Sequence, residues 1–202
     1  MKRLKPLINC LLLGAIALLI GAMIWQQAQR QQSVRLDYDN PTPSPSTHLS
    51  PELGQSKTAE VIDVHDGDTI KVSLNGRQER IRFCGIDAPE LAQPGGTASR
   101  DHLRSLIAAA DNRVMFMETD KDRYGRTVAE VFLPASQPGD EETFLNYEQV
   151  KSGDAYVYTQ YVKSCPNGWA LPQGEAEAKQ ARSGVWANSQ AMKPWDYRRA
   201  NR

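Results

Sequence analysis

The order of the predicted elements favours an α+β domain, mainly β, in which a five-stranded barrel carries three helices on its outside. Three observations predict it. Alternating strands rich in β-branched residues come first, a segment with helical period separates them from a second strand pair, and two further helices follow. Three strands, a helix, two strands and two helices is the order expected for a five-stranded Greek-key barrel of the OB type.

The first three strands are predicted over residues 59–65, 69–74 and 77–83. Apolar and polar residues alternate along them, as in strands with one buried face. Asn75-Gly76, between the second and third segments, is a strong signal for a two-residue hairpin turn. The sequence therefore predicts a three-stranded antiparallel start to the domain.

A helix is predicted over residues 97–110, with Leu103, Leu106 and Ile107 on one face. Thr97 or Ser99 is expected to cap its N-terminus. The remaining elements are two strands and two helices, the helices ending at glycines: strands 113–119 and 126–133, then helices 141–153 and 173–184.

The N-terminal part of the chain differs in character from this domain. Residues 1–25 hold an apolar run long enough to cross a bilayer, preceded by Lys2, Arg3 and Lys5. The positive-inside rule places the N-terminus in the cytoplasm and the rest outside it. A cleaved signal peptide, and hence a secreted protein, is the alternative reading. Residues 26–57, rich in Pro, Ser and Gln, are predicted to be a disordered tether, and residues 58–202 to be the folded domain.

The charge of the folded domain excludes one class of function. From residue 59 onward the chain has 18 Lys and Arg against 21 Asp and Glu. A strongly basic protein that coats nucleic acid is therefore not expected. Any phosphate ligand must be held by a few placed cations.

Three short clusters carry candidate chemistry. HDGDTI contains Asp68, RFCGIDAPE contains Arg82, Asp87 and Glu90, and DKDRYGRTVAE contains Arg126. Aspartates at strand ends suit a hard divalent cation, and arginine binds phosphate oxygens in pairs. With a glutamate to orient or deprotonate water, these groups suit hydrolysis of a phosphodiester. Each cluster alone is also typical of an ordinary turn or salt bridge, so the prediction depends on all three.

Together the three clusters and the C-terminal segments EAEAKQARSGVW and PWDYRR resemble the staphylococcal nuclease (thermonuclease) family over residues 59–197. The resemblance implies an OB-type barrel and Ca²⁺-dependent cleavage of DNA and RNA to 3′-phosphate ends. The site residues that it implies fall into three groups: metal ligands Asp68, Asp87 and the main-chain carbonyl of Ala88; catalytic residues Arg82, Arg126 and Glu90, the last as general base; and nucleotide-pocket residues Arg123, Tyr124 and Tyr161.

Two other features of the domain leave alternatives open. Cys84 and Cys165 form a disulfide if the domain is extracytoplasmic, or remain two unpaired thiols. Tryptophans 169, 186 and 195 are expected to pack in the core or against helices, with base stacking as the alternative. PWDYRR is expected to fold back onto the barrel.

The sequence leads to a membrane-anchored, extracytoplasmic endonuclease that acts as a monomer on DNA and RNA. The competing hypotheses are a nuclease-like module that only binds nucleic acid or protein, and a structural membrane protein whose charges pair with one another.

Overall fold

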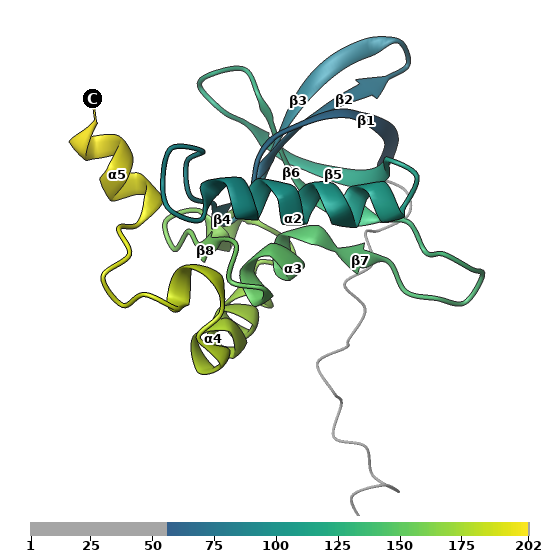
Figure 1. The fold of residues 1–202 in the computed structure, drawn as a ribbon. Helices are drawn as coiled ribbons and strands as arrows, with labels where there is room; N and C mark the ends of the chain where they lie inside the picture. Colours follow the sequence, from purple (N-terminus) through teal and green to yellow (C-terminus); the bar gives the residue numbers. More distant parts are fainter. Residues whose placement is uncertain (1–55, 202) are drawn as a thin grey trace, which may run out of the picture. The chain divides into compact units, whose positions relative to one another are not determined.

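The computed structural model describes residues 56–201, shown as the coloured ribbon in Figure 1. The predicted anchor at 1–25, and the predicted tether up to residue 55, lie outside these described residues. Within residues 56–201, no helix has the length and apolar character needed to span a membrane.

Five strands close into a barrel. Along the sheet the order is β3-β2-β1-β5-β6, with antiparallel neighbours, and β3 also pairs with β6 in parallel to close the circle. The closing pair runs from Ile81 opposite Thr127 to Phe83 opposite Ala129. The predicted five-stranded barrel is confirmed. Its strands are β1 (Lys57–Asp66), β2 (Thr69–Leu74), β3 (Arg77–Phe83), β5 (Arg113–Lys121) and β6 (Thr127–Leu133).

Helices and short strands surround this barrel. In Figure 1, α2 lies across the barrel, α3 and α4 lie together on one side of it, and α5 is at the edge of the domain. The α-helices are α2 (Gly96–Ala109), α3 (Leu145–Lys151), α4 (Leu171–Ala181) and α5 (Pro194–Ala200). The short elements are β4 (Ile86–Asp87), β7 (Thr143–Phe144), β8 (Tyr156–Val157) and the 3₁₀ turns η1 (Val162–Ser164) and η2 (Gly184–Trp186).

The prediction of three helices was wrong, because residues 56–201 contain four α-helices. The additional helix, α5, has only seven residues and starts at Pro194, so it is too short to show an apolar period. The expected start of the second predicted helix, at residue 141, was also early: β7 pairs with β6 before α3 begins at Leu145. The cap of α2 differs as well. Gly95 precedes the helix with φ 90° and no side chain caps it, so Thr97 and Ser99 lie inside the helix.

The core fills the barrel and the space beneath α2. Phe83, Phe116 and Ile81 point inward from the strands and are fully buried. Leu103 and Ile107 of α2 pack on the same core, as their spacing predicted. Burial of a large apolar side chain contributes about 1.5–3 kcal/mol, so the barrel and α2 hold each other in place.

A disulfide and a buried asparagine fix the end of β3. Cys84, just after β3, is bonded to Cys165 in the loop after η1. Asn146 at the start of α3 donates to the carbonyl oxygen of Cys84 (2.9 Å) and accepts from the amide of Val131 in β6 (3.0 Å). The alternative of two unpaired thiols is therefore not what the structure has. The segment between β3 and β4, which joins the candidate site residues, is therefore held to the loop after η1 and, through α3, to β6.

Candidate active site

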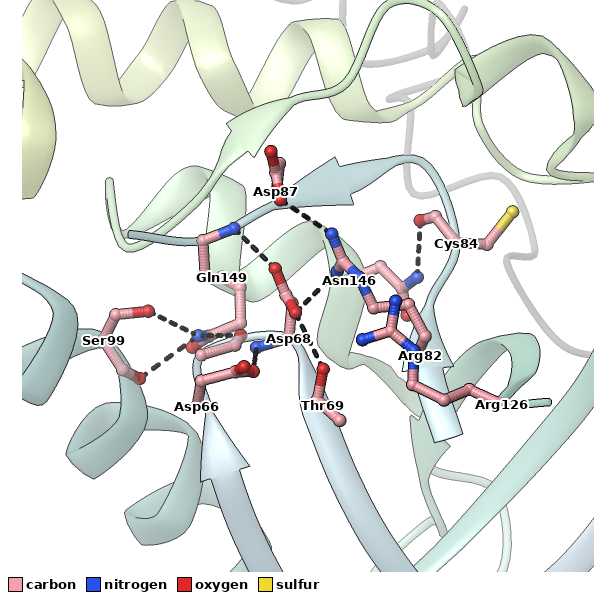
Figure 2. A network of polar contacts seen from close by, with 12 residues as sticks. Asp66, Asp68, Thr69, Arg82, Cys84, Asp87, Ser99, Arg126, Asn146 and Gln149 are labelled. Carbon is pink, nitrogen blue, oxygen red and sulfur yellow. Dashed lines mark hydrogen bonds and ion pairs between the residues drawn. The ribbon is translucent and has the colours of Figure 1, made fainter. Parts of the chain in front are cut away.

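Three side chains from separate segments meet at one end of the barrel. Asp68 ends the turn between β1 and β2, Arg82 lies in β3, and Asp87 ends β4. Arg82 lies between the two acids: its Nη1 is 2.6 Å from Asp68 Oδ1 and its Nη2 is 2.8 Å from Asp87 Oδ1. Figure 2 shows this Asp68–Arg82–Asp87 cluster from close by. The structure thus brings together three of the residues that the sequence singled out.

Burial dominates the electrostatics of the cluster. Asp68 and Asp87 are both buried. Burial raises the pKa of Asp87 above its usual range, although hydrogen bonds from Arg198 oppose this. Burial also disfavours the charge of Arg82, but Asp68 and Asp87 outweigh it and raise the pKa of the guanidinium. The Arg82 guanidinium therefore keeps its charge, and the burial that raises the pKa of Asp87 favours a further positive charge beside that carboxylate.

The neighbouring Asp66 has a different role. Its Oδ1 accepts a hydrogen bond from the amide of Asp68 (3.1 Å), so it shapes the turn that presents Asp68. Burial, and then the charge of Asp68, raise the pKa of Asp66 to about 7. At neutral pH the pair therefore holds less negative charge than two free aspartates would.

Asp68 is held in a fixed orientation by its surroundings. Thr69 Oγ1 donates to its Oδ1 (3.0 Å) and the amide of Ala88 donates to its Oδ2 (2.6 Å). The turn itself is held by Gln149, whose Nε2 donates to the carbonyl oxygen of Gly67 (2.7 Å). A side chain at Gly67 would collide with Ser99 of α2. The turn is clamped between α2 and α3.

Gln149 was missed by the sequence reasoning. It is fully buried in α3, together with Asn146 one turn before it. Buried amides need partners, and both residues use theirs to fix main-chain carbonyls next to the site. The sequence signal that could have indicated this role is a pair of amide side chains, Asn146 and Gln149, three residues apart in one short helix.

Glu90 lies just beyond β4 and reaches the cluster indirectly. Its side chain is 36% exposed, and its main-chain amide donates to Gln93 Oε1 (2.9 Å). Its Oε1 is 2.7 Å from Nη1 of Arg198, which also contacts Asp87. Arg198 thus connects Glu90 to the Asp68–Arg82–Asp87 cluster.

Arg198 is the second residue that the sequence reasoning missed. It belongs to α5, within the PWDYRR segment, and its guanidinium contacts both oxygens of Asp87: Nη2 is 2.6 Å from Oδ2 and Nη1 is 3.1 Å from Oδ1. Burial disfavours the charge of Arg198, but the hydrogen bonds to Asp87 and Glu90 raise its pKa. The expectation that PWDYRR folds back onto the barrel is met, and the segment reaches the site itself.

The third sequence cluster lies next to the site rather than in contact with its acids. Arg126 precedes β6, which runs beside β3, and Figure 2 shows its side chain extending toward Arg82. Its Nε is 2.6 Å from Asp122 Oδ2. Tyr124 is 69% exposed, with the guanidinium of Arg123 4.9 Å from its ring centre. These residues form an exposed edge with two cations and an aromatic ring.

Tyr161, the other predicted pocket residue, immediately precedes η1 and belongs to a group of aromatic side chains. It is 51% exposed and packs edge-on against Tyr158 (4.9 Å between ring centres). Tyr158 in turn stacks on Trp195 of α5 (5.2 Å, 6° between planes). Trp195 is therefore packed as expected, whereas the expectation for Trp169 was wrong because its side chain is 56% exposed.

The donor set fits a hard divalent cation. Asp68 and Asp87 supply carboxylate oxygens that both contact the guanidinium of Arg82, and the carbonyl of Ala88 follows Asp87 directly in the chain. Oxygen donors of this kind are what Ca²⁺ prefers. In the described part of the chain, no three His, Cys, Asp or Glu side chains are grouped as a metal site. A cation here would rely on these two acids, main-chain oxygen and water.

Known proteins share sequence similarity with most of the folded domain. The family model described as "Staphylococcal nuclease homologue" matches residues 80–188. The chain is 37% identical over 145 residues to a protein named "Micrococcal nuclease" from Shigella flexneri, covering 71% of this chain and 81% of that protein. An "Uncharacterized endonuclease" from Escherichia coli O157:H7 is 36% identical over 138 residues, 68% of this chain and 82% of that protein. "Protein ParB" from Escherichia coli is 35% identical over 144 residues, 69% and 78% respectively.

The family match covers more than half of the chain, including Arg82, Asp87, Glu90 and Arg126. The relatives extend the similarity to about two thirds of the chain or more at over 30% identity. The chain is therefore a nuclease of the staphylococcal nuclease family.

Proposed function

We propose that this endonuclease is a Ca²⁺-dependent phosphodiesterase that hydrolyses DNA and RNA with low sequence specificity and leaves 3′-phosphate ends. The observation that supports the proposal most directly is the Asp68–Arg82–Asp87 cluster. It joins two buried acids to an arginine at the end of the barrel, with Glu90 at its exposed side. Cation-binding acids and a phosphate-binding arginine in one place suit a phosphodiester better than any neutral substrate.

Asp68, Asp87 and the carbonyl of Ala88 would hold the Ca²⁺ ion. When bound there, the ion supplies a fixed double positive charge close to the scissile phosphate. The protein's own contribution is to keep the two carboxylates rigid, through Thr69 and the amide of Ala88. Rigid donors cost less to organise when the substrate arrives.

Arg82 and Arg126 would bind the non-bridging phosphate oxygens. Charge on these oxygens grows as the pentacoordinate transition state forms, and a planar guanidinium can donate two hydrogen bonds to it. Arg126 would turn toward a phosphate at the expense of its partly buried pair with Asp122. Arg123, Tyr124 and Tyr161 would hold the neighbouring nucleotide on the exposed edge.

Glu90 would orient the attacking water and accept its proton. Its side chain is 36% exposed, so water can reach it, and Arg198 links it to Asp87. Attack at phosphorus with departure of the 5′ oxygen leaves the phosphate on the 3′ side. Because the proposed contacts are to phosphate and ring faces, little sequence preference is expected.

We also propose that the domain works outside the cytoplasm, tethered by residues 1–25, as a monomer. The disulfide between Cys84 and Cys165 supports an oxidising compartment, in which such bonds persist. Membrane fractionation, with and without protease added to intact cells, tests this placement. A nuclease domain that the added protease cannot digest, even after the outer envelope is opened, would contradict this placement.

The test of the activity is a cleavage assay on the full-length chain in non-ionic detergent. Single-stranded DNA, duplex DNA and RNA are incubated with Ca²⁺ or with chelator, and the product ends are mapped. We expect Ca²⁺-dependent cleavage that Glu90→Gln lowers by about 10²–10⁴-fold, the usual contribution of a general base. Glu60→Gln, an exposed change in β1, is the matched control and should leave the rate unchanged.

Arg82→Lys tests the phosphate role separately. Lysine keeps the charge between Asp68 and Asp87 but loses the paired donors, so cleavage should fall while the folded state survives. Cleavage that persists in both Glu90→Gln and Arg82→Lys would contradict the proposed site. A folded parent chain that binds DNA without cutting it in any cation would favour the binding module.

A further inference from the structure

The guanidinium of Arg198, in the C-terminal helix α5, contacts one of the proposed metal ligands and the proposed general base. Nη1 of Arg198 is 2.7 Å from Glu90 Oε1 and 3.1 Å from Asp87 Oδ1, and Nη2 is 2.6 Å from Asp87 Oδ2. One guanidinium therefore spans two carboxylates that lie three residues apart in the chain. These are charge-assisted hydrogen bonds, the strong class.

Arg198 and Arg82 together use both oxygens of Asp87. Arg82 Nη2 is on Oδ1 (2.8 Å), where Arg198 Nη1 is also within reach, and Arg198 Nη2 is on Oδ2. Asp87 is almost fully buried, so no other face of the carboxylate is open. Each Asp87 oxygen that a divalent cation would bind is therefore already contacted by an arginine.

Of the two arginines, Arg198 is placed to give way. Arg82 is fixed in a barrel strand and is also paired with Asp68, and its side chain is largely buried. The side chain of Arg198 is 38% exposed and comes from the last helix of the chain. Moving Arg198 leaves Asp87 paired with Arg82, whereas moving Arg82 would leave Asp68 without its arginine in the interior.

The rest of α5 keeps Arg198 close after such a move. Trp195 is stacked on Tyr158 and packs edge-on against Tyr156 (5.9 Å). Lys193 Nζ also lies over the ring of Trp195, 5.1 Å from its centre. The helix is thus anchored by aromatic contacts that do not involve the carboxylates, and the guanidinium can leave them while α5 remains docked.

We propose that Arg198 is a further positioning residue of this site, which holds Asp87 and Glu90 in the metal-free protein and yields them to the divalent cation. The inference rests on the proposed use of Ca²⁺ by Asp68 and Asp87. It predicts that Arg198 lowers the affinity for Ca²⁺, because the ion must displace it. A residue that only braces the fold would raise that affinity or leave it unchanged.

The test is isothermal titration of Ca²⁺ into the full-length, chelator-treated chain without nucleic acid. Arg198→Ala should lower the Kd for Ca²⁺ by about tenfold or more, since a charge-assisted contact no longer has to be broken. Arg198→Lys should give an intermediate Kd, because an ammonium cannot span both carboxylates. Arg199→Ala, which removes an exposed arginine paired with its neighbour Asp196, is the matched control and should leave the Kd unchanged.

Thermal melts establish that each variant is folded before it is titrated, and Arg198→Lys serves if the alanine variant is not. An unchanged or higher Kd in folded Arg198 variants would overturn the inference even if the parent chain binds Ca²⁺ and cleaves DNA. Loss of Ca²⁺ binding in Asp87→Asn, with tight binding in Arg198→Ala, would support both the proposed Ca²⁺ site and the proposed role of Arg198. If neither the parent nor Arg198→Ala binds Ca²⁺, the cation proposal and this inference both fail, and Ca²⁺-independent cleavage would identify that case.

Discussion

Reduction of the Cys84–Cys165 disulfide is expected to remove a large part of the stability of the domain. The bond closes a loop with a sequence separation of 81 residues. In the chain-entropy model, a loop of this length restricts the unfolded chain by about 4.5 kcal/mol at 25 °C. Domains of this size have a free energy of unfolding of about 5–15 kcal/mol in total, so the loss should be obvious.

The assay is urea unfolding of the full-length chain in detergent, followed by tryptophan fluorescence, with and without reductant. Comparison of oxidised and reduced parent chain changes no side-chain volume, so it isolates the cross-link. A Cys84→Ala/Cys165→Ala chain, in which reductant should have no effect, is the control for reductant acting elsewhere. A fall of less than about 1 kcal/mol on reduction of the parent would refute the reasoning, since the unfolded chain would then gain little freedom.

Three further predictions concern the site and its approach. Gln149→Leu should lower the free energy of unfolding by about 1–3 kcal/mol, measured by urea titration, because the carbonyl of Gly67 loses its buried donor; an unchanged value would show that water replaces the amide. Burial and then Asp68 raise the pKa of Asp66 from 3.8 to about 7. Between these values the folded chain keeps a proton that the unfolded chain has lost, so stability in chelator should fall as pH rises from about 4 to 7, and Asp66→Asn should remove that part of the fall. Each phosphate contact on a single strand adds about −0.7 to the slope of log affinity against log salt, so Arg123→Ala should make the slope shallower by about 0.7, and an unchanged slope would remove Arg123 from the substrate path.

The barrel could be predicted from the sequence because each of its strands carries a local signal. Alternation marks the five long strands, and Asn75-Gly76 marks a hairpin. The two-residue strands β4, β7 and β8 carry no such signal, since their pairing depends on segments distant in the chain. Helix α5 was missed for a related reason: seven residues beginning with a proline show no helical period.

The same distinction applies to the candidate site. Asp68, Arg82 and Asp87 fall within a short stretch at strand ends, so local turns bring them together and the sequence could indicate them. Arg198 meets Asp87 only because α5 docks by aromatic contacts across 111 residues of chain. Gln149 is likewise recruited by packing of α3, 82 residues from Gly67. Spacing alone cannot predict contacts of this kind.

The parallel pairing of β3 with β6 has a consequence for how the enzyme loses activity. Only three residue pairs form this seam, and Arg82 is in the middle one, opposite Val128, while Arg126 lies one residue before Thr127, where the seam begins on β6. The two phosphate-binding candidates, Arg82 and Arg126, therefore come from opposite sides of this parallel pairing. The β3–β6 hydrogen bonds can break while every antiparallel strand pair of the barrel stays intact. A brief opening there would separate them while the remaining strands stay paired. Inactivation by mild denaturant should then precede the loss of β-structure, and catalytic rate would report the integrity of the seam rather than of the whole domain.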